Sequence, residues 1–178
     1  MGSYYYLAAQ LPYLVYGQTV PMSAAEFREL ARDKMSSAEA AVLDFCTLDP
    51  GFSAPPTHSA FINHWREWER TLRLNLGKSR SQKLKRADTA DAPEHPADAV
   101  TAAKNALALE SPLDAEIFLD KARWDAIDSF QGINTFSEDA MYAYLLKLLL
   151  MERRTAFNHD EGNTEYKALY AAILGEAK

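Results

Sequence analysis

The chain has 178 residues, of which 48% are hydrophobic and 25% charged, ordinary proportions for a globular protein. This length allows one domain with a substantial buried core. The single cysteine, Cys46, excludes an internal disulfide and a cysteine-based zinc site, and it favours a reducing cytoplasm. Because Cys46 follows Phe45 on an apolar helix face, we expect its thiol to be buried.

The net charge of −6 is unevenly distributed. Residues 1–86 hold 11 Lys and Arg against 8 Asp and Glu, whereas residues 87–178 hold 8 against 17, a net charge of −9. This division predicts two electrostatically different surfaces rather than a protein that binds nucleic acid throughout.

The chain opens on SYYYLAAQLPYLVYG, residues 3–17. No Lys or Arg precedes Arg28, and Pro12 and Gly17 interrupt the apolar run, so we expect neither a secretory signal nor a membrane-spanning helix. The Tyr and Val residues are typical of strands, although the intervening Ala and Gln residues are not.

Three helices are expected next. Ser23 with Glu26, and Ser36 with Glu39, have the spacing of capping boxes. A third helix is predicted from about residue 58 to residue 76, with one strongly apolar side. Its charged residues are expected on the other sides: Arg66, Glu67, Glu69, Arg70 and Arg73.

Residues 78–98 change character, since a basic stretch gives way to acidic residues and prolines. We predict an exposed charged linker here, with a short helical start as an option. Helices then resume with ADAVTAAKNALAL and with a segment that Ser111 caps, Pro112 begins and Gly132 ends. That segment and the apolar helix beginning near Thr135 are expected to form an antiparallel hairpin, and NTEYKALYAAILGEAK is expected to form the last helix.

The pattern predicts an all-α fold, a single domain over residues 1–178 built as a bundle of six to seven helices with an extended N-terminal arm. The predicted core residues share apolar positions at helical spacing. They are Phe61, Trp65, Trp68, Leu72, Ile117, Trp124, Ile127, Leu145, Leu148, Leu149, Leu169 and Ile173.

Catalytic and metal-binding motifs are scarce. His64 and Glu67, one turn apart and near His58, resemble half of a di-iron pair in reverse order, which gives the alternative of a helical-bundle enzyme or metal protein. We expect no catalytic group, metal or cofactor, because no second such pair and no glycine-rich phosphate loop occurs. Four acidic residues of one helix are interpreted as its solvated face: Glu116, Asp120, Asp125 and Asp128.

Two basic features could bind partners. The stretch KSRSQKLKR, Lys78 to Arg86, lacks interleaved aromatic residues, so a solvated excursion is favoured over a nucleic-acid site. Arg153 and Arg154 follow the apolar run LLKLLLM. Three interpretations are open for these two arginines. They are the exposed end of a core helix, they bind the carboxylates of a partner, or they form an internal salt bridge with Asp160 or Glu161.

The opening stretch SYYYLAAQLPYLVYGQTVPMSAAEFRELA resembles the start of a bacterial family known as domain of unknown function 2764. Genes of that family lie among those for V-type ATPase components, in the place expected for the C-type component, which joins the rotor stalk to the membrane ring. The helix YAYLLKLLLMERR is also faintly similar to this C-type component, an all-helical protein.

The resemblance implies a non-catalytic, C-type-like or accessory component of a V-type ATPase, located in the cytoplasm and associated with the membrane through the complex. Its partners would be the proteins of the rotor stalk and the membrane ring, without nucleic acid and without insertion into the membrane. The first residues would form an extended or short helical arm packed on the bundle. The residues expected to contact partners are Tyr4, Tyr5, Tyr6, Tyr13, Arg153 and Arg154.

Overall fold

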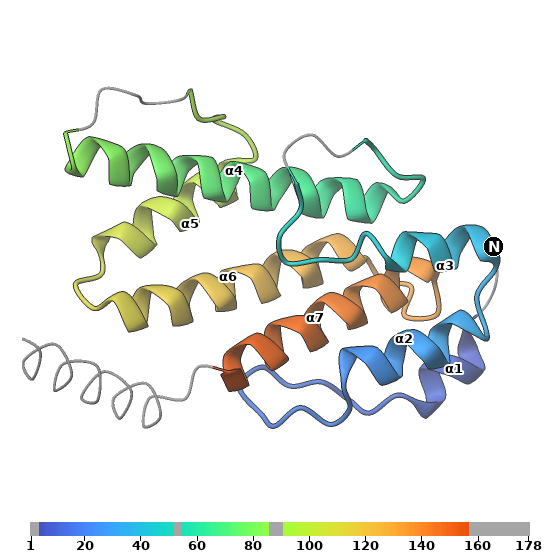
Figure 1. The fold of residues 1–178 in the computed structure, drawn as a ribbon. Helices are drawn as coiled ribbons and strands as arrows, with labels where there is room; N and C mark the ends of the chain where they lie inside the picture. The colour runs from blue at the N-terminus through green and yellow to red at the C-terminus, as the bar shows by residue number, and fades with distance from the viewer. Residues whose placement is uncertain (1–3, 52–54, 86–90, 157–178) are drawn as a thin grey trace, which may run out of the picture.

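The computed structural model describes residues 4–51, 55–85 and 91–156, and within these ranges it contains seven helices and no strand. The all-α prediction is therefore confirmed (Figure 1). None of the helices in the described ranges combines the length and apolar character that a membrane crossing requires. In chain order the helices are α1 (Tyr5–Gln10), α2 (Ala24–Arg32), α3 (Ser37–Leu43), α4 (Ala60–Lys83), α5 (Ala97–Ala108), α6 (Pro112–Gln131) and α7 (Glu138–Ala156).

The helices α4, α5, α6 and α7 form the body of the molecule, and each packs on the next along the chain. Figure 1 shows α6 and α7 as an antiparallel hairpin, as the sequence predicts, with α4 lying across α6 on the opposite side from α7. The shorter helices α2 and α3 cover α7. We call residues 4–16 the N-terminal segment. The turn between α6 and α7 lies beside this segment, whereas the α5–α6 turn lies at the other end of the molecule (Figure 1).

Local capping chemistry explains where several helices begin and end. Both predicted capping boxes form, since Ser23 and Ser36 each accept the backbone N–H of the glutamate three residues later. Ser111 accepts the N–H of Asp114 to begin α6, and Gly132 ends it with a φ of 71°. A positive φ is accessible to glycine without the steric cost that a β-carbon imposes.

The helix α4 is longer than predicted and includes residues 78–83, which were assigned to an exposed linker. These residues correspond to the short helical start that the linker prediction allowed, and they continue α4. Lys, Arg and Gln have favourable helix propensities, and cations at a helix C-terminus are stabilised by the helix dipole. Residues 91–96, just before α5, contain no helix, in keeping with the rest of the prediction.

The core lies where α4, α6 and α7 meet, and most predicted core residues are fully buried there. Ile117 is 40% exposed, so its assignment to the core is wrong. It lies near the start of α6, which faces the last turn of α7 in the antiparallel hairpin. Leu149 is half-buried, and Leu169 and Ile173 lie outside the described residues. Cys46 is buried, as expected, and this burial raises the pKa of its thiol.

Two stacked tryptophans connect α4 to α5 and to the segment that follows α3. The rings of Trp65 and Trp68 lie 6.0 Å apart, and both side chains are almost completely buried. The Trp65 indole N–H donates to the Thr47 carbonyl at 3.0 Å, and the Trp68 indole donates to the Asp98 carboxylate at 2.7 Å. Each ring therefore supplies core volume and one long-range hydrogen bond.

Replacing Trp65 by Ala is expected to lower the free energy of unfolding by about 3–5 kcal/mol, because it leaves a large cavity and an unpaired Thr47 carbonyl. Chemical denaturation followed by circular dichroism measures the loss. The Ile133→Ala variant is the control, since Ile133 is fully exposed and its loss should change stability by about 0.5 kcal/mol or less. Equal stabilities of the two variants would contradict the packing described for α4.

Candidate functional site

The N-terminal segment begins with a buried tyrosine. Tyr4 is 5% exposed, and its backbone N–H donates to the Phe136 carbonyl at 3.1 Å. Its hydroxyl donates to the Glu39 carboxylate, and burial together with that carboxylate raises the pKa of Tyr4. Tyr4 is thus an internal anchor. Of the four tyrosines expected to contact partners, it alone is buried, whereas the other three are exposed.

Glu39 is the acceptor on which this anchor depends. Hydrogen bonds from the Ser36 hydroxyl and then from Tyr4 lower the pKa of its carboxyl group. Its backbone carbonyl accepts the Tyr142 hydroxyl of α7 at 3.1 Å. A helix-capping residue of α3 therefore also joins the N-terminal segment to α7.

Residues 11–16 continue along the α6–α7 hairpin without regular secondary structure. The Tyr144 hydroxyl donates to the Pro12 carbonyl at 2.9 Å, and burial raises the pKa of Tyr144 to about 12. Leu14 is buried in the core. The Tyr16 hydroxyl donates to the Ile117 carbonyl at 3.1 Å.

Tyr16 lies between an indole and two cations. Its ring meets that of Trp124 edge-on, with 5.6 Å between the centroids. The cationic groups of Arg154 and Lys121 lie 5.1 Å and 5.9 Å from the Tyr16 ring centroid, within the range of cation–π attraction. The segment is therefore fixed to the body at both of its ends.

Exposed aromatic side chains lie on the anchored segment and on the adjoining α6–α7 turn. The Tyr5 ring contacts Tyr6 and Phe136, with centroid distances of 5.8 Å and 5.1 Å. Tyr6 is 81% exposed and Tyr13 is 90% exposed. We call this the aromatic surface; it consists of Tyr5, Tyr6, Tyr13 and Phe136.

A groove of about 310 Å³ lies beside Tyr13 and Phe136 of the aromatic surface, between residues 11–14 and the α6–α7 turn. Lys147 is the one charged residue among those described that line it. Its ammonium pairs with Asp128 and lies 5.2 Å from the Trp124 ring centroid. A surface rich in aromatic side chains and poor in charge is typical of protein–protein interfaces.

A buried ion pair joins α4 to α6 on the other side of the core. The Arg123 guanidinium donates two hydrogen bonds to the Glu69 carboxylate, each of 3.0 Å. The Glu69 side chain is fully buried and that of Arg123 is 5% exposed. Burial alone would lower the pKa of Arg123, but the charge of Glu69 and its hydrogen bonds raise it above the usual value.

The expectation that Glu69 lies on the wet side of its helix is wrong. It occupies the same stripe as Trp65, Trp68 and Leu72, and this spacing was visible in the sequence. The interpretation of Asp120 as part of a solvated face is also wrong, because Asp120 is 6% exposed and accepts a hydrogen bond from Arg123 at 3.2 Å.

Two further arginines extend the buried pair at its edges. Arg73 donates to Glu69 at 2.7 Å and to the Leu48 carbonyl, and it also pairs with Asp49. At the other edge, Arg153 pairs with Glu116 at 2.9 Å and lies 3.9 Å from Asp120. We call the whole set the ion network; it consists of Asp49, Glu69, Arg73, Glu116, Asp120, Arg123 and Arg153.

The structure thus gives each predicted arginine an internal role. Arg153 joins α7 to α6 through Glu116, whereas the proposed pairing with Asp160 or Glu161 lies outside the described residues. Arg154 is exposed but its guanidinium packs over Tyr16. Their contact with a partner stays a prediction.

The residues considered for a metal or catalytic site are not brought together. His58, His64 and Glu67 are all exposed. The described residues contain no group of three His, Cys, Asp or Glu side chains placed to hold a metal ion. Asp125 and Asp128 are exposed, as expected, and pair with Lys121 and Lys147. In the basic stretch, Lys78 is half-buried, whereas Arg80 and Lys83 are exposed in the last turn of α4.

Comparison of the chain with protein-family models, with curated proteins and with solved structures gave no match.

The ion network predicts a pattern of stabilities. Arg123→Met leaves Glu69 buried without its principal partner and is expected to lower the free energy of unfolding by about 3–5 kcal/mol. Adding Glu69→Leu removes that buried charge, which would otherwise keep only Arg73 as a partner, so the double variant should be more stable than the single one. Urea unfolding of both variants measures this order.

Arg32→Met serves as the surface control for that series. Arg32 and Asp44 form an exposed pair, which is expected to contribute about 1 kcal/mol or less. If Arg123→Met were no more destabilising than Arg32→Met, the buried pair would not have the importance given to it here.

The burial of Asp120 leads us to expect that the stability of the fold depends on pH. Burial raises the pKa of Asp120 above its ordinary value of 3.8, against the opposing effect of Arg153 and Arg123. The folded chain therefore keeps this proton to a higher pH than the unfolded chain does. As pH rises from about 3.8 through the raised pKa, the wild type should lose stability relative to Asp120→Asn. Urea titrations of both proteins over this interval test the sign, and a relative gain by the wild type would contradict it.

Proposed function

We propose that this chain is a non-catalytic adaptor, a C-type-like or accessory component of a V-type ATPase that couples the central rotor stalk to the membrane ring. The observation that carries the proposal is the aromatic surface, which is exposed on a segment that the rest of the fold anchors. The assignment to a V-type ATPase comes from the resemblance of that same segment to domain of unknown function 2764.

The composition of the aromatic surface suits a protein partner. Exposed Tyr and Phe side chains each present up to roughly 200 Å², and aromatic residues are enriched in the centres of interfaces. Tyr6 and Tyr13 are almost fully exposed. Burying their rings in a partner would provide much of the binding energy, and their hydroxyls would provide directional hydrogen bonds.

An adaptor that transmits force also needs a body that does not deform. Here the Glu69–Arg123 pair joins α4 to α6, and the Arg153–Glu116 pair joins α6 to α7. The Tyr144–Pro12 and Tyr4–Glu39 hydrogen bonds attach the N-terminal segment to α7 and α3. These links place a partner that binds the aromatic surface in a fixed position relative to the helical body.

The alternative, an enzyme or metal protein centred on His64 and Glu67, finds no specific support in the described geometry. Neither side chain is buried, and both lie on α4. The one ring contact of His64 among the described residues is with Phe130, at 6.1 Å between centroids. The adaptor therefore remains the proposed function.

Isolation of the intact V-type ATPase from the source cells, through an affinity tag on this chain, tests the proposal. The wild type is expected to recover proteins of the stalk and the ring. The Tyr6→Ser, Tyr13→Ser double variant is expected to recover at least about tenfold less, because it removes two exposed anchors of the interface. Recovery is measured by quantitative mass spectrometry of the purified material.

The control is Phe45→Ser, which removes a half-exposed aromatic side chain outside the aromatic surface. It should recover the complex as the wild type does. Recovery of the tagged wild-type chain without proteins of the stalk or the ring would reject the V-type ATPase assignment. Unchanged recovery by the double tyrosine variant would reject the aromatic surface as the site of contact.

A further inference from the structure

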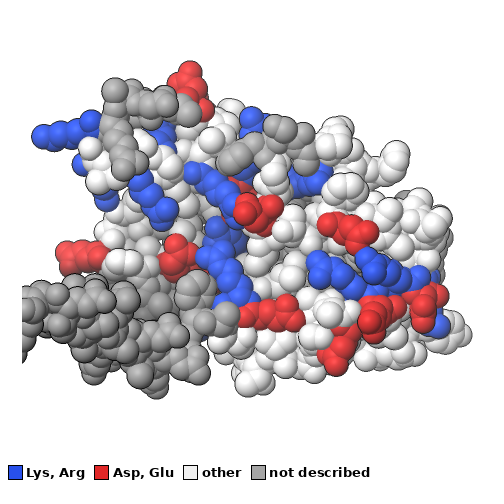
Figure 2. Space-filling view, in the orientation of Figure 1, with Lys and Arg blue, Asp and Glu red and all other residues white. Residues whose placement is uncertain are grey.

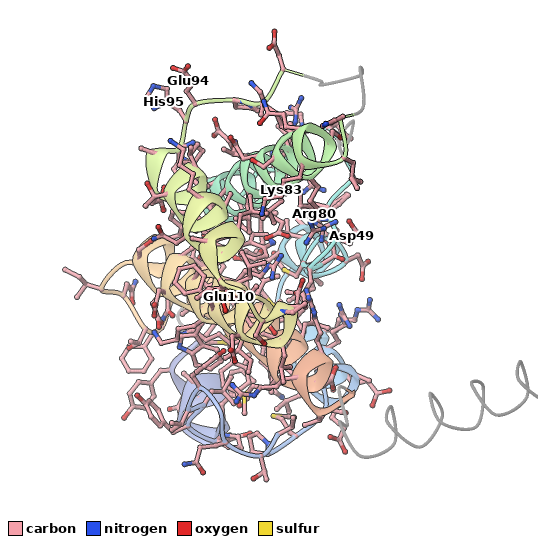
Figure 3. The ribbon with its side chains drawn as sticks, turned by 90° about the vertical axis from the view of Figure 1, so that its left-hand side faces the viewer. Asp49, Arg80, Lys83, Glu94, His95 and Glu110 are labelled. Carbon is pink, nitrogen blue, oxygen red and sulfur yellow. The ribbon has the colours of Figure 1, made fainter. Side chains whose placement is uncertain are left out.

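One end of the molecule combines the C-terminus of α4 with the connection between α5 and α6 (Figures 1 and 3). The Lys83 ammonium donates to the Leu107 carbonyl at 3.2 Å and holds the two parts together. A shallow, open hollow lies between them. Its described lining residues are Ser79, Gln82, Lys83, Lys104, Leu107 and Ala108.

Cations gather at this end. Arg80, Lys83, Lys85 and Lys104 are exposed, and none of them forms an ion pair with a described residue. Figure 3 shows Arg80 and Lys83 beside each other on α4, and Figure 2 shows blue side chains gathered over the end of this helix. The chain as a whole carries a net charge of −6, so this positive surface is a local feature.

Exposed leucines lie at the same end of the molecule (Figure 1). Leu84, directly between Lys83 and Lys85, is 64% exposed. Leu109 ends α5 and is 42% exposed, and Leu113 in the first turn of α6 is 54% exposed. We call the four exposed cations and these three leucines the basic end.

Acidic residues offset only part of this charge. Glu110 and Asp114, which flank the start of α6, are exposed near the leucines, and Figure 3 shows Glu110 below Lys83. The four exposed cations outnumber these two carboxylates, and half-buried Lys78 adds a further positive charge one turn before Gln82 on α4. A negatively charged surface would therefore be attracted to the basic end.

The types of side chain distinguish among negatively charged partners. Binding of single-stranded nucleic acid uses aromatic rings on which bases stack, and no aromatic residue belongs to the basic end. Pairing with protein carboxylates favours the planar fork of arginine, whereas three of the four exposed cations are lysines. Flexible lysines around exposed leucines fit a lipid surface, because the leucines enter the boundary of the acyl chains while the ammonium groups remain among the headgroups.

We propose that the basic end binds the surface of an anionic lipid bilayer. Lys83, Lys85 and Lys104 contact the negatively charged headgroups, and Leu84 enters the interface between headgroups and acyl chains. This binding is peripheral, involves no membrane crossing, and does not depend on the proposed role in a V-type ATPase.

Sedimentation with lipid vesicles tests the proposal on the full chain. The protein should bind vesicles that contain phosphatidylserine, should not bind vesicles of phosphatidylcholine alone, and should be released by high salt. The Lys83→Glu, Lys104→Glu double variant should lower the bound-to-free ratio at least about tenfold, since each basic residue near an anionic surface contributes to binding. Leu84→Ser should lower it by about threefold or more.

The matched control is Lys34→Glu with Arg70→Glu, which changes the net charge by the same amount. Both residues are exposed, lie outside the basic end, and form no ion pair with a described residue. Retained binding by this control supports the proposal. Equal losses in the control and the basic-end variant would overturn it, because attraction would then follow net charge alone.

Other outcomes overturn the proposal and identify another partner. Absence of vesicle binding by the wild type rejects a lipid surface. Binding to a single-stranded oligonucleotide without binding to vesicles assigns the basic end to nucleic acid. Unchanged vesicle binding by Leu84→Ser rejects insertion of the leucine. Far-UV circular dichroism of each variant verifies that its helices are intact.

Discussion

The arrangement of the helical body depends on one buried ion pair. Glu69 and Arg123 lie 54 residues apart, on α4 and α6, and each is almost completely removed from water. A charge in such surroundings is stable only with a partner, so these two helices are constrained to meet at one register. Purely apolar helix faces allow several packings, whereas the two parallel hydrogen bonds between Glu69 and Arg123 are satisfied in one.

The edges of the ion network transmit this constraint to other parts of the molecule. Arg73 fixes the segment after α3 through the Leu48 carbonyl and Asp49, and Arg153 fixes the last turn of α7 through Glu116. The N-terminal segment is held in a different way, by tyrosine hydroxyls that donate to carbonyl and carboxylate oxygens. Charged groups thus set the register of the helices in the body, and tyrosine hydroxyls attach the N-terminal segment to the body.

The two candidate binding surfaces lie at opposite ends of α6. The aromatic surface adjoins the C-terminal end of α6 and its turn to α7, whereas the basic end includes the first turn (Figure 1). A 20-residue helix is about 30 Å long, so partners at the two surfaces would not compete for space. An aromatic surface for a protein and a basic end for lipid would suit an adaptor that works next to a membrane.

The sequence by itself determined the local features of this protein. Capping boxes at Ser23 and Ser36, the cap at Ser111 and the stop at Gly132 follow from chemistry within a few residues, and the apolar stripe of α4 follows from helical spacing. Only the tertiary structure decided which polar residues are buried and which residues they pair with. In the sequence Glu69 resembles a surface charge, but in the structure it is buried against Arg123. Arg153 resembles a free helix end, but it pairs with Glu116. Tyr4 resembles its exposed neighbours, but it is buried and its hydroxyl bonds to Glu39. The physical reason is that a cap is satisfied by its own neighbours in sequence, whereas a buried charge or hydroxyl is satisfied by whichever distant residue the packing brings to it.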